Sequence, residues 1–200
     1  KALNDELHLG VPEKPKDLFC AMDYHLDWIY ASLTLALPKG NEGPYRCRTS
    51  EEELGFTQED VDMLVAFEGS AGQCHIVLVE AKGDTNWSNS QLASKAKRLN
   101  AIFGSDGRNY PNVTPHFIIL SPWEPPSRLK ATYHDGDQDK PFPVWMLADS
   151  PLHFHWIELS NMSDKLKRKE LRKVTHCDQN GNPDVGGDCW KAEPVGGKNW

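Results

Sequence analysis

Two carboxylates and one ammonium group in the first half of the chain could do chemistry together. They belong to Asp62, Glu80 and Lys82. Carboxylate oxygens are hard ligands of the kind that Mg²⁺ and Mn²⁺ prefer, and a lysine fixed beside a bound metal can stabilise negative charge that develops in a reaction. These residues can form such a site only if the fold brings them to one place.

The segments that carry these residues form a predicted β-hairpin. Two apolar runs rich in β-branched residues, 61–67 and 75–81, flank a short segment that contains Gly69 and Gly72. Apolar runs joined in this way are typical of a hairpin. A turn centred near Ala71 then sets the register of the two strands.

In this register Asp62 lies directly opposite Glu80, and Asp60 lies opposite Lys82. Directly opposed residues of an antiparallel pair share a face, with Cβ atoms about 4.5 to 5.5 Å apart. Because opposed like charges are destabilising, Asp62 and Glu80 favour a cation between them. The alternative is a rim ion pair between Asp60 and Lys82, with the acidic residues ending the strands in solvent.

The order of these residues resembles the PD-(D/E)xK nuclease superfamily over residues 58–120. Its hallmark is an acid at the start of one strand and E-x-K at the end of the hairpin partner. Asp62 and the run Glu80-Ala81-Lys82 match that pattern, and a helix opening near Gln91 follows. Val61 stands in place of the proline of the motif.

The resemblance implies a restriction-endonuclease-like α/β core, with a mixed central β-sheet flanked by helices. It also implies metal-dependent hydrolysis of phosphodiester bonds in nucleic acid, with DNA favoured as the substrate. Asp62, Glu80 and the Ala81 carbonyl would hold Mg²⁺ or Mn²⁺. Lys82 would position the attacking water or stabilise its hydroxide form, and Gln91 would orient the substrate.

The sequence leaves two alternatives and one ligand open. One alternative is a non-catalytic nucleic-acid-binding module that retains the nuclease fold. The other is an α/β enzyme of a different class, in which Glu80 and Lys82 are only a structural pair. The candidates for a third acidic ligand are Asp27, Glu51, Glu52, Glu53 and Asp60.

A helix over 89–103, ended by Gly104, is predicted after the hairpin. At 100° per residue, it has an apolar stripe formed by Leu92, Ala96, Leu99 and Phe103. A neighbouring stripe of Gln91, Lys95 and Arg98 is expected to point to the edge of the sheet, with Lys95 and Arg98 on flanking phosphates. The alternative for this stripe is the exposed, solubilising face of a surface helix.

Other apolar patterns predict the rest of the fold. A strand at 116–120 is expected beside the E-x-K strand, joined to it by the helix as a crossover unit. Further strands at 142–147 and 154–159 would give a sheet of five or six strands. Residues 17–37 predict a helix, and the polar run 128–140 predicts a loop.

The last part of the chain combines a basic stretch with a predicted hairpin. Lys167, Arg168 and Lys169 concentrate positive charge in an otherwise acidic protein, which predicts a phosphate-attracting surface. A solvated face is the alternative. Segments 174–177 and 189–191 flank an Asn-Gly pair and predict an antiparallel hairpin.

Length and composition predict a globular chain rather than a membrane or disordered protein. The 200 residues suit one domain, 1–200, with the basic stretch and hairpin at 163–200 as its end. No apolar run approaches the length that spans a bilayer. A net charge of −7 argues against non-specific coating of nucleic acid, and an odd count of 5 cysteines favours a reducing, cytoplasmic setting. A homodimer is left open.

Overall fold

The computed structural model describes most of the chain, in segments. These are residues 2–8, 15, 17–36, 59–69, 72–83, 87–122, 124–125, 129, 131–135, 137–148, 154–159 and 172–194. The chain divides into two compact units, residues 1–158 and 159–200, and we describe each by itself. The predicted C-terminal hairpin belongs to the second unit.

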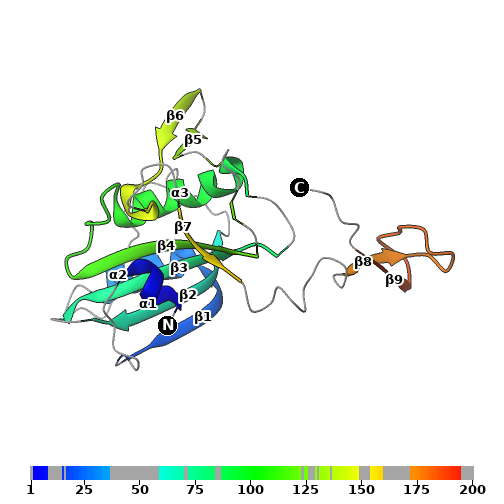
Figure 1. Cartoon of the computed structure of the whole chain (residues 1–200), viewed down its shortest axis with the longest axis horizontal. Coiled ribbons are helices and arrows are strands. Elements are labelled where there is room, and N and C mark those ends of the chain that lie inside the picture. The colour runs from blue at the N-terminus through cyan, green and yellow to red at the C-terminus, as the bar shows by residue number, and fades with distance from the viewer. Residues whose placement is uncertain are drawn as a thin grey trace. The chain divides into compact units, whose positions relative to one another are not determined.

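A mixed β-sheet of five strands organises the first unit (Figure 1). Its strands, in spatial order, are β1 (Phe19–His25), β2 (Asp60–Glu68), β3 (Cys74–Ala81), β4 (Val113–Ser121) and β7 (His155–Glu158). β2 is antiparallel to both β1 and β3, whereas β4 is parallel to β3 and β7 is parallel to β4. The unit is therefore a mixed α/β fold, as the sequence predicts.

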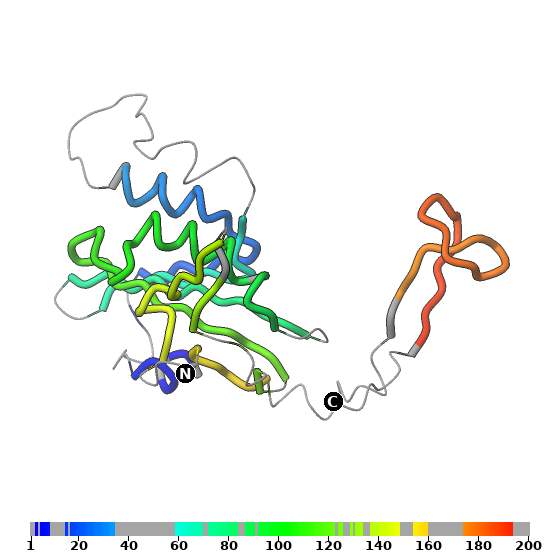
Figure 2. Tube along the Cα trace, turned by 90° about the horizontal axis from the view of Figure 1, so that it is seen from above, coloured from blue at the N-terminus to red at the C-terminus, as the bar shows by residue number. Residues whose placement is uncertain are grey.

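The helices lie on both faces of this sheet. They are α1 (Ala2–Leu7), α2 (Leu26–Ala36) and α3 (Asn89–Phe103). Figure 2 shows α2 and α3 side by side on one face, with α1 on the other. None of the helices in the described ranges is long and apolar enough to cross a membrane.

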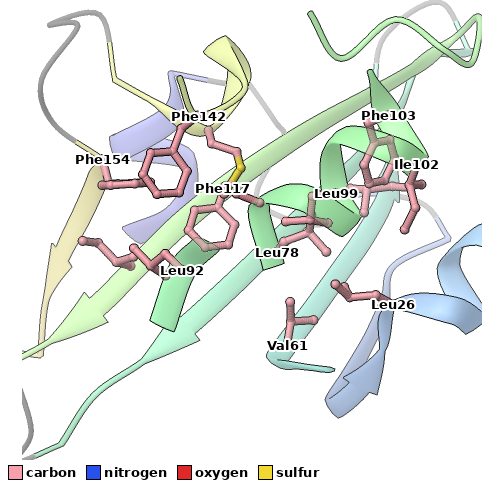
Figure 3. Packing of buried hydrophobic residues seen from close by; sticks show 14 of the residues in the cluster. Leu26, Val61, Leu78, Leu92, Leu99, Ile102, Phe103, Phe117, Phe142 and Phe154 are labelled. Atoms are coloured by element: carbon pink, nitrogen blue, oxygen red, sulfur yellow. The ribbon is translucent and has the colours of Figure 1, made fainter. Parts of the chain in front are cut away.

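The main hydrophobic core fills the space between α3 and the sheet (Figure 3). The predicted apolar stripe of α3 is confirmed, because all of its members are buried there: Leu92, Ala96, Leu99 and Phe103. They pack with Leu78 of β3 and Phe117 of β4. Each buried side chain of this size contributes about 1.5 to 3 kcal/mol, so this packing fixes α3 over β3.

The central hairpin has the predicted register. Met63 pairs with Val79 and Leu64 pairs with Leu78, which is the predicted alignment up to the residues before Asp62 and Glu80. Gly72 lies in the predicted turn and has a φ of 75°. This backbone conformation favours a residue without Cβ. The crossover from β3 through α3 to the parallel strand β4 is likewise as predicted.

The helix predicted at 17–37 is wrong in its first half. Residues 19–25 form β1, the edge strand that pairs with β2, and α2 begins only at Leu26. The helical spacing of Leu18 and Met22 suggested a core stripe, yet these side chains are 56% and 66% exposed. Backbone pairing with β2 makes this segment a strand. The pairing is interrupted at Asp23, which has a φ of 49°.

Two later predictions also need correction. The strand expected at 142–147 is a 3₁₀ turn, Val144–Met146, since Pro143 lacks the amide hydrogen that a ladder needs. The loop expected at 128–140 instead contains a small hairpin. Its strands are β5 (Thr132–Asp135) and β6 (Gln138–Pro141).

The second unit contains the predicted antiparallel hairpin. Its strands are β8 (Arg172–Cys177) and β9 (Cys189–Pro194). The Asn-Gly turn lies within a longer connection, residues 178–188, where Gly181 has a φ of 83° and donates its N–H to the carbonyl of Asp178 at 3.0 Å.

Candidate active site

Asp62 and the E-x-K segment meet where β2 begins and β3 ends. Oδ2 of Asp62 accepts the backbone N–H of Ala81 at 2.6 Å. This bond lies just beyond the last backbone pair, Met63 with Val79, and links the next residue of β2 to the last residue of β3. It holds the Asp62 carboxylate against the E-x-K segment and leaves Oδ1 unused by this contact.

Glu80 is the buried acid of the site. Its side chain lies within the α3 face of the sheet, and the residue is only 5% exposed. Burial raises the pKa of Glu80 from 4.5 to about 7, and the nearby charge of Asp62 adds to the rise, whereas Lys95 and Lys82 oppose it. Near neutral pH, the carboxyl can therefore exchange a proton for another cation.

Lys95 of α3 is the cation that contacts this acid. Its Nζ lies 2.9 Å from Oε1 of Glu80, 3.6 Å from Oε2 of Glu59 and 3.8 Å from Oδ1 of Asp60, and it also donates to the backbone carbonyl of Asp60. Burial alone would lower the pKa of Lys95, but the carboxylates around it outweigh burial and raise the pKa.

One carboxylate oxygen of Glu80, Oε1, is buried without a hydrogen-bond donor of good geometry among the described residues. The contact with Lys95 at 2.9 Å is an ion pair. A buried carboxylate oxygen in this state fits a cation ligand, and Asp62 supplies a second hard oxygen donor beside it.

A complete set of metal ligands is not assembled by the described residues. No group of three or more described His, Cys, Asp or Glu side chains is placed to hold a metal ion. Among the candidate third ligands, Asp60 contacts Lys95 and Asp27 contacts Arg98. Glu51, Glu52 and Glu53 lie outside the described residues.

Lys82 lies beside an indole ring at the end of the same strand. Its Nζ is 5.7 Å from the centroid of Trp87, within range of a cation–π interaction. Its backbone N–H donates to the carbonyl of Leu120 at 2.8 Å, and the indole of the buried Trp87 donates to Ser121 at 3.3 Å. The fold thus fixes the backbone of Lys82, and the residue is partly exposed.

The other predicted contacts with substrate have different surroundings from those expected. Arg98 is buried, with Nη1 3.0 Å from Oδ1 of Asp27. Together with Lys95, it contacts carboxylates of this chain, whereas the sequence led us to expect contacts with substrate phosphates. Gln91 lies in the first half of α3, and its side chain is outside what the structure describes.

Two points remain from the sequence predictions: the basic stretch and an acid, Glu59, that the sequence did not single out. Lys167, Arg168 and Lys169 lie outside the described residues, so their predicted role stays a prediction. Sequence reasoning missed Glu59, which contacts Lys95 and accepts a hydrogen bond from Ser94 at 2.5 Å. The position of Glu59 just before β2, near the start of the strand that carries Asp62, could have suggested it.

Comparison with known proteins adds no relative to this picture. The chain matches no family model, no curated protein and no solved structure.

Proposed function

We propose that the chain is a Mg²⁺- or Mn²⁺-dependent phosphodiesterase of the PD-(D/E)xK kind that cleaves nucleic acid, with DNA as the favoured substrate. The observation that carries this proposal is the 2.6 Å bond from the Ala81 N–H to Asp62, which sets Asp62 beside Glu80. A hairpin with these acids, a crossover helix and a parallel strand is also what a restriction-endonuclease-like core would contain.

The residues of the chain would share the work in a simple way. Asp62 and Glu80, with the Ala81 carbonyl, would hold the metal. When bound, the metal would supply an acidified water and neutralise charge on the phosphate. Lys82, which is partly exposed, would approach the substrate side and stabilise negative charge there. Gln91, in the first half of α3, would orient the substrate.

A non-catalytic nucleic-acid-binding module is the second candidate. The Lys95 contact with Glu80 favours it, because the ammonium already balances the buried carboxylate. In that case the acids would be a structural ion pair, and no metal would be needed to offset their repulsion. The two candidates differ in one measurable property, which is metal-dependent cleavage.

Cleavage assays on purified protein test the main proposal. Single-stranded and double-stranded DNA and RNA are incubated with Mg²⁺ or Mn²⁺, with and without EDTA. Cleavage should require the metal and should fall by at least about a hundredfold in Glu80→Gln and Lys82→Ala. Lys97→Ala, an exposed lysine on α3, is the matched control. If no substrate is cut, the binding module is the better description.

Binding can be tested apart from cleavage. Changing Lys167, Arg168 and Lys169 together to glutamate should weaken nucleic-acid affinity and flatten its dependence on salt. The Mn²⁺-induced rise in Tm should stay the same, because the metal ligands are intact. Unchanged affinity and salt slope would assign these residues to a solvated face.

A further inference from the structure

The C-terminal hairpin has almost no hydrophobic core of its own. Across the described residues of β8, β9 and their connection, Cys177 is the buried side chain. The large apolar side chains are exposed instead, with Val185 at 95% and Trp190 at 68%. Units this small cannot bury enough surface to be stable alone and commonly use a disulfide or a metal.

The strand pairing places two thiols where a covalent link could form. Cys177 of β8 pairs directly with Cys189 of β9, and both are free thiols in the structure. Directly opposed residues of an antiparallel pair have Cα atoms about 4.5 or 5.5 Å apart. Both values lie within the range of about 4.4 to 6.8 Å that a disulfide spans, so no change of register is needed.

The connecting loop holds Cys177 in this position. The amide of Asp178 donates to the Asn182 carbonyl at 2.9 Å, and the amide of Asp184 donates to the His176 carbonyl at 3.0 Å. Gly187 packs so closely that a Cβ there would lie 2.1 Å from the Cys177 carbonyl oxygen. The backbone of the loop therefore packs against the backbone of Cys177.

A zinc site is less consistent with these contacts. The neighbouring His176 lies on the other face of β8, since successive side chains of a strand alternate. Its ring contacts Trp190, and its Nδ1 lies 3.1 Å from the Val185 carbonyl oxygen. Among the described residues of the second unit, the remaining partner for each thiol is the other thiol.

We propose that Cys177 and Cys189 form a reversible disulfide that closes the C-terminal hairpin. The oxidant is a small-molecule disulfide of the glutathione class. The Cys189 thiolate, which is more exposed, attacks one sulfur of the oxidant and releases one thiolate. The Cys177 thiolate then attacks the Cys189 sulfur and releases the second. Two protein thiols are oxidised and one disulfide is reduced to two thiols, which take up the two protons that the protein thiols lose.

The test uses the full chain equilibrated in glutathione buffers from fully reduced to fully oxidised. Alkylation followed by peptide mass spectrometry should show a Cys177–Cys189 linked peptide, with a loss of two hydrogens, in oxidising buffer only. Amide hydrogen exchange across 172–194 should slow by at least tenfold on oxidation and return to its first rate on reduction. Cys20→Ser, which removes an exposed thiol in β1, should leave both results unchanged.

Cys189→Ser should abolish the redox dependence of exchange while matching the reduced wild type, which shows that the variant still folds. Three results would overturn the proposal. They are equal alkylation of both cysteines in every buffer, linkage of either one to another cysteine, and thiol protection that zinc confers and a reductant does not remove.

Discussion

Lys95 Nζ lies 2.9 Å from Oε1 of Glu80, and this contact ties α3 to the end of β3 inside the candidate site. The ammonium has further acids around it at 3.6 Å and 3.8 Å, from Glu59 and Asp60. A divalent metal bound to Glu80 would compete with Lys95 for the same oxygen. The site can therefore be tested by changing each partner in turn.

Removing the ammonium should leave a buried carboxylate without its partner. Lys95→Met should lower the free energy of unfolding by about 3 kcal/mol at pH 8.5. The loss should be smaller at pH 5.5, because Glu80 is then protonated and carries no charge to compensate. Urea denaturation at both pH values measures this, with Lys97→Met as the exposed control. An equal loss at both pH values would mean that Lys95 acts through packing alone.

Glu80 should make the stability of the protein depend on pH. Its pKa is about 7 in the folded state against 4.5 ordinarily, so the folded protein keeps a proton that the unfolded chain loses between these values. Stability from this group is fully present below pH 4.5 and falls as pH rises to about 7. The difference in unfolding free energy between wild type and Glu80→Gln should change by about 3 kcal/mol across that window. A constant difference would contradict the raised pKa.

Asp62 should show separable structural and chemical roles. Asp62→Ala loses the acceptor of the Ala81 N–H and should destabilise the protein by about 1 to 2 kcal/mol. Asp62→Asn can keep an oxygen acceptor and removes the repulsion with Glu80, so its stability should lie within about 0.5 kcal/mol of wild type. Both should lose the Mn²⁺-induced rise in Tm measured by thermal unfolding. A metal-induced rise that survives in both variants would exclude Asp62 as a ligand.

Lys82 should matter for cleavage far more than for folding. Its ammonium contacts the Trp87 ring at 5.7 Å, and a contact of this kind at a partly exposed residue is worth about 0.5 to 1 kcal/mol. Lys82→Ala should therefore abolish cleavage while the free energy of unfolding changes by less than about 1 kcal/mol. Cleavage rates and urea denaturation on the same preparation decide this. A variant that unfolds while its residual folded fraction still cuts would make Lys82 a structural residue.

Much of the fold around the site could be predicted from local patterns. The hairpin of β2 and β3 follows from two apolar runs joined by glycines, and its register puts Asp62 beside Glu80. The helix α3 ends at Gly104 as its sequence indicates, and its apolar stripe faces the core. These features depend on residues close together in the chain, whose spacing has one favourable geometry.

Contacts between distant residues decided the rest. The segment 19–25 has apolar residues at helical spacing, but pairing with β2 makes it a strand. Lys95 and Arg98 were expected to contact phosphates at the edge of the sheet, yet the packing of α3 brings them against Glu80 and Asp27. No local sequence pattern predicts such contacts between distant residues. The partner of a buried charge depends on which elements pack together, and only the tertiary structure brings those elements within a few ångströms of each other.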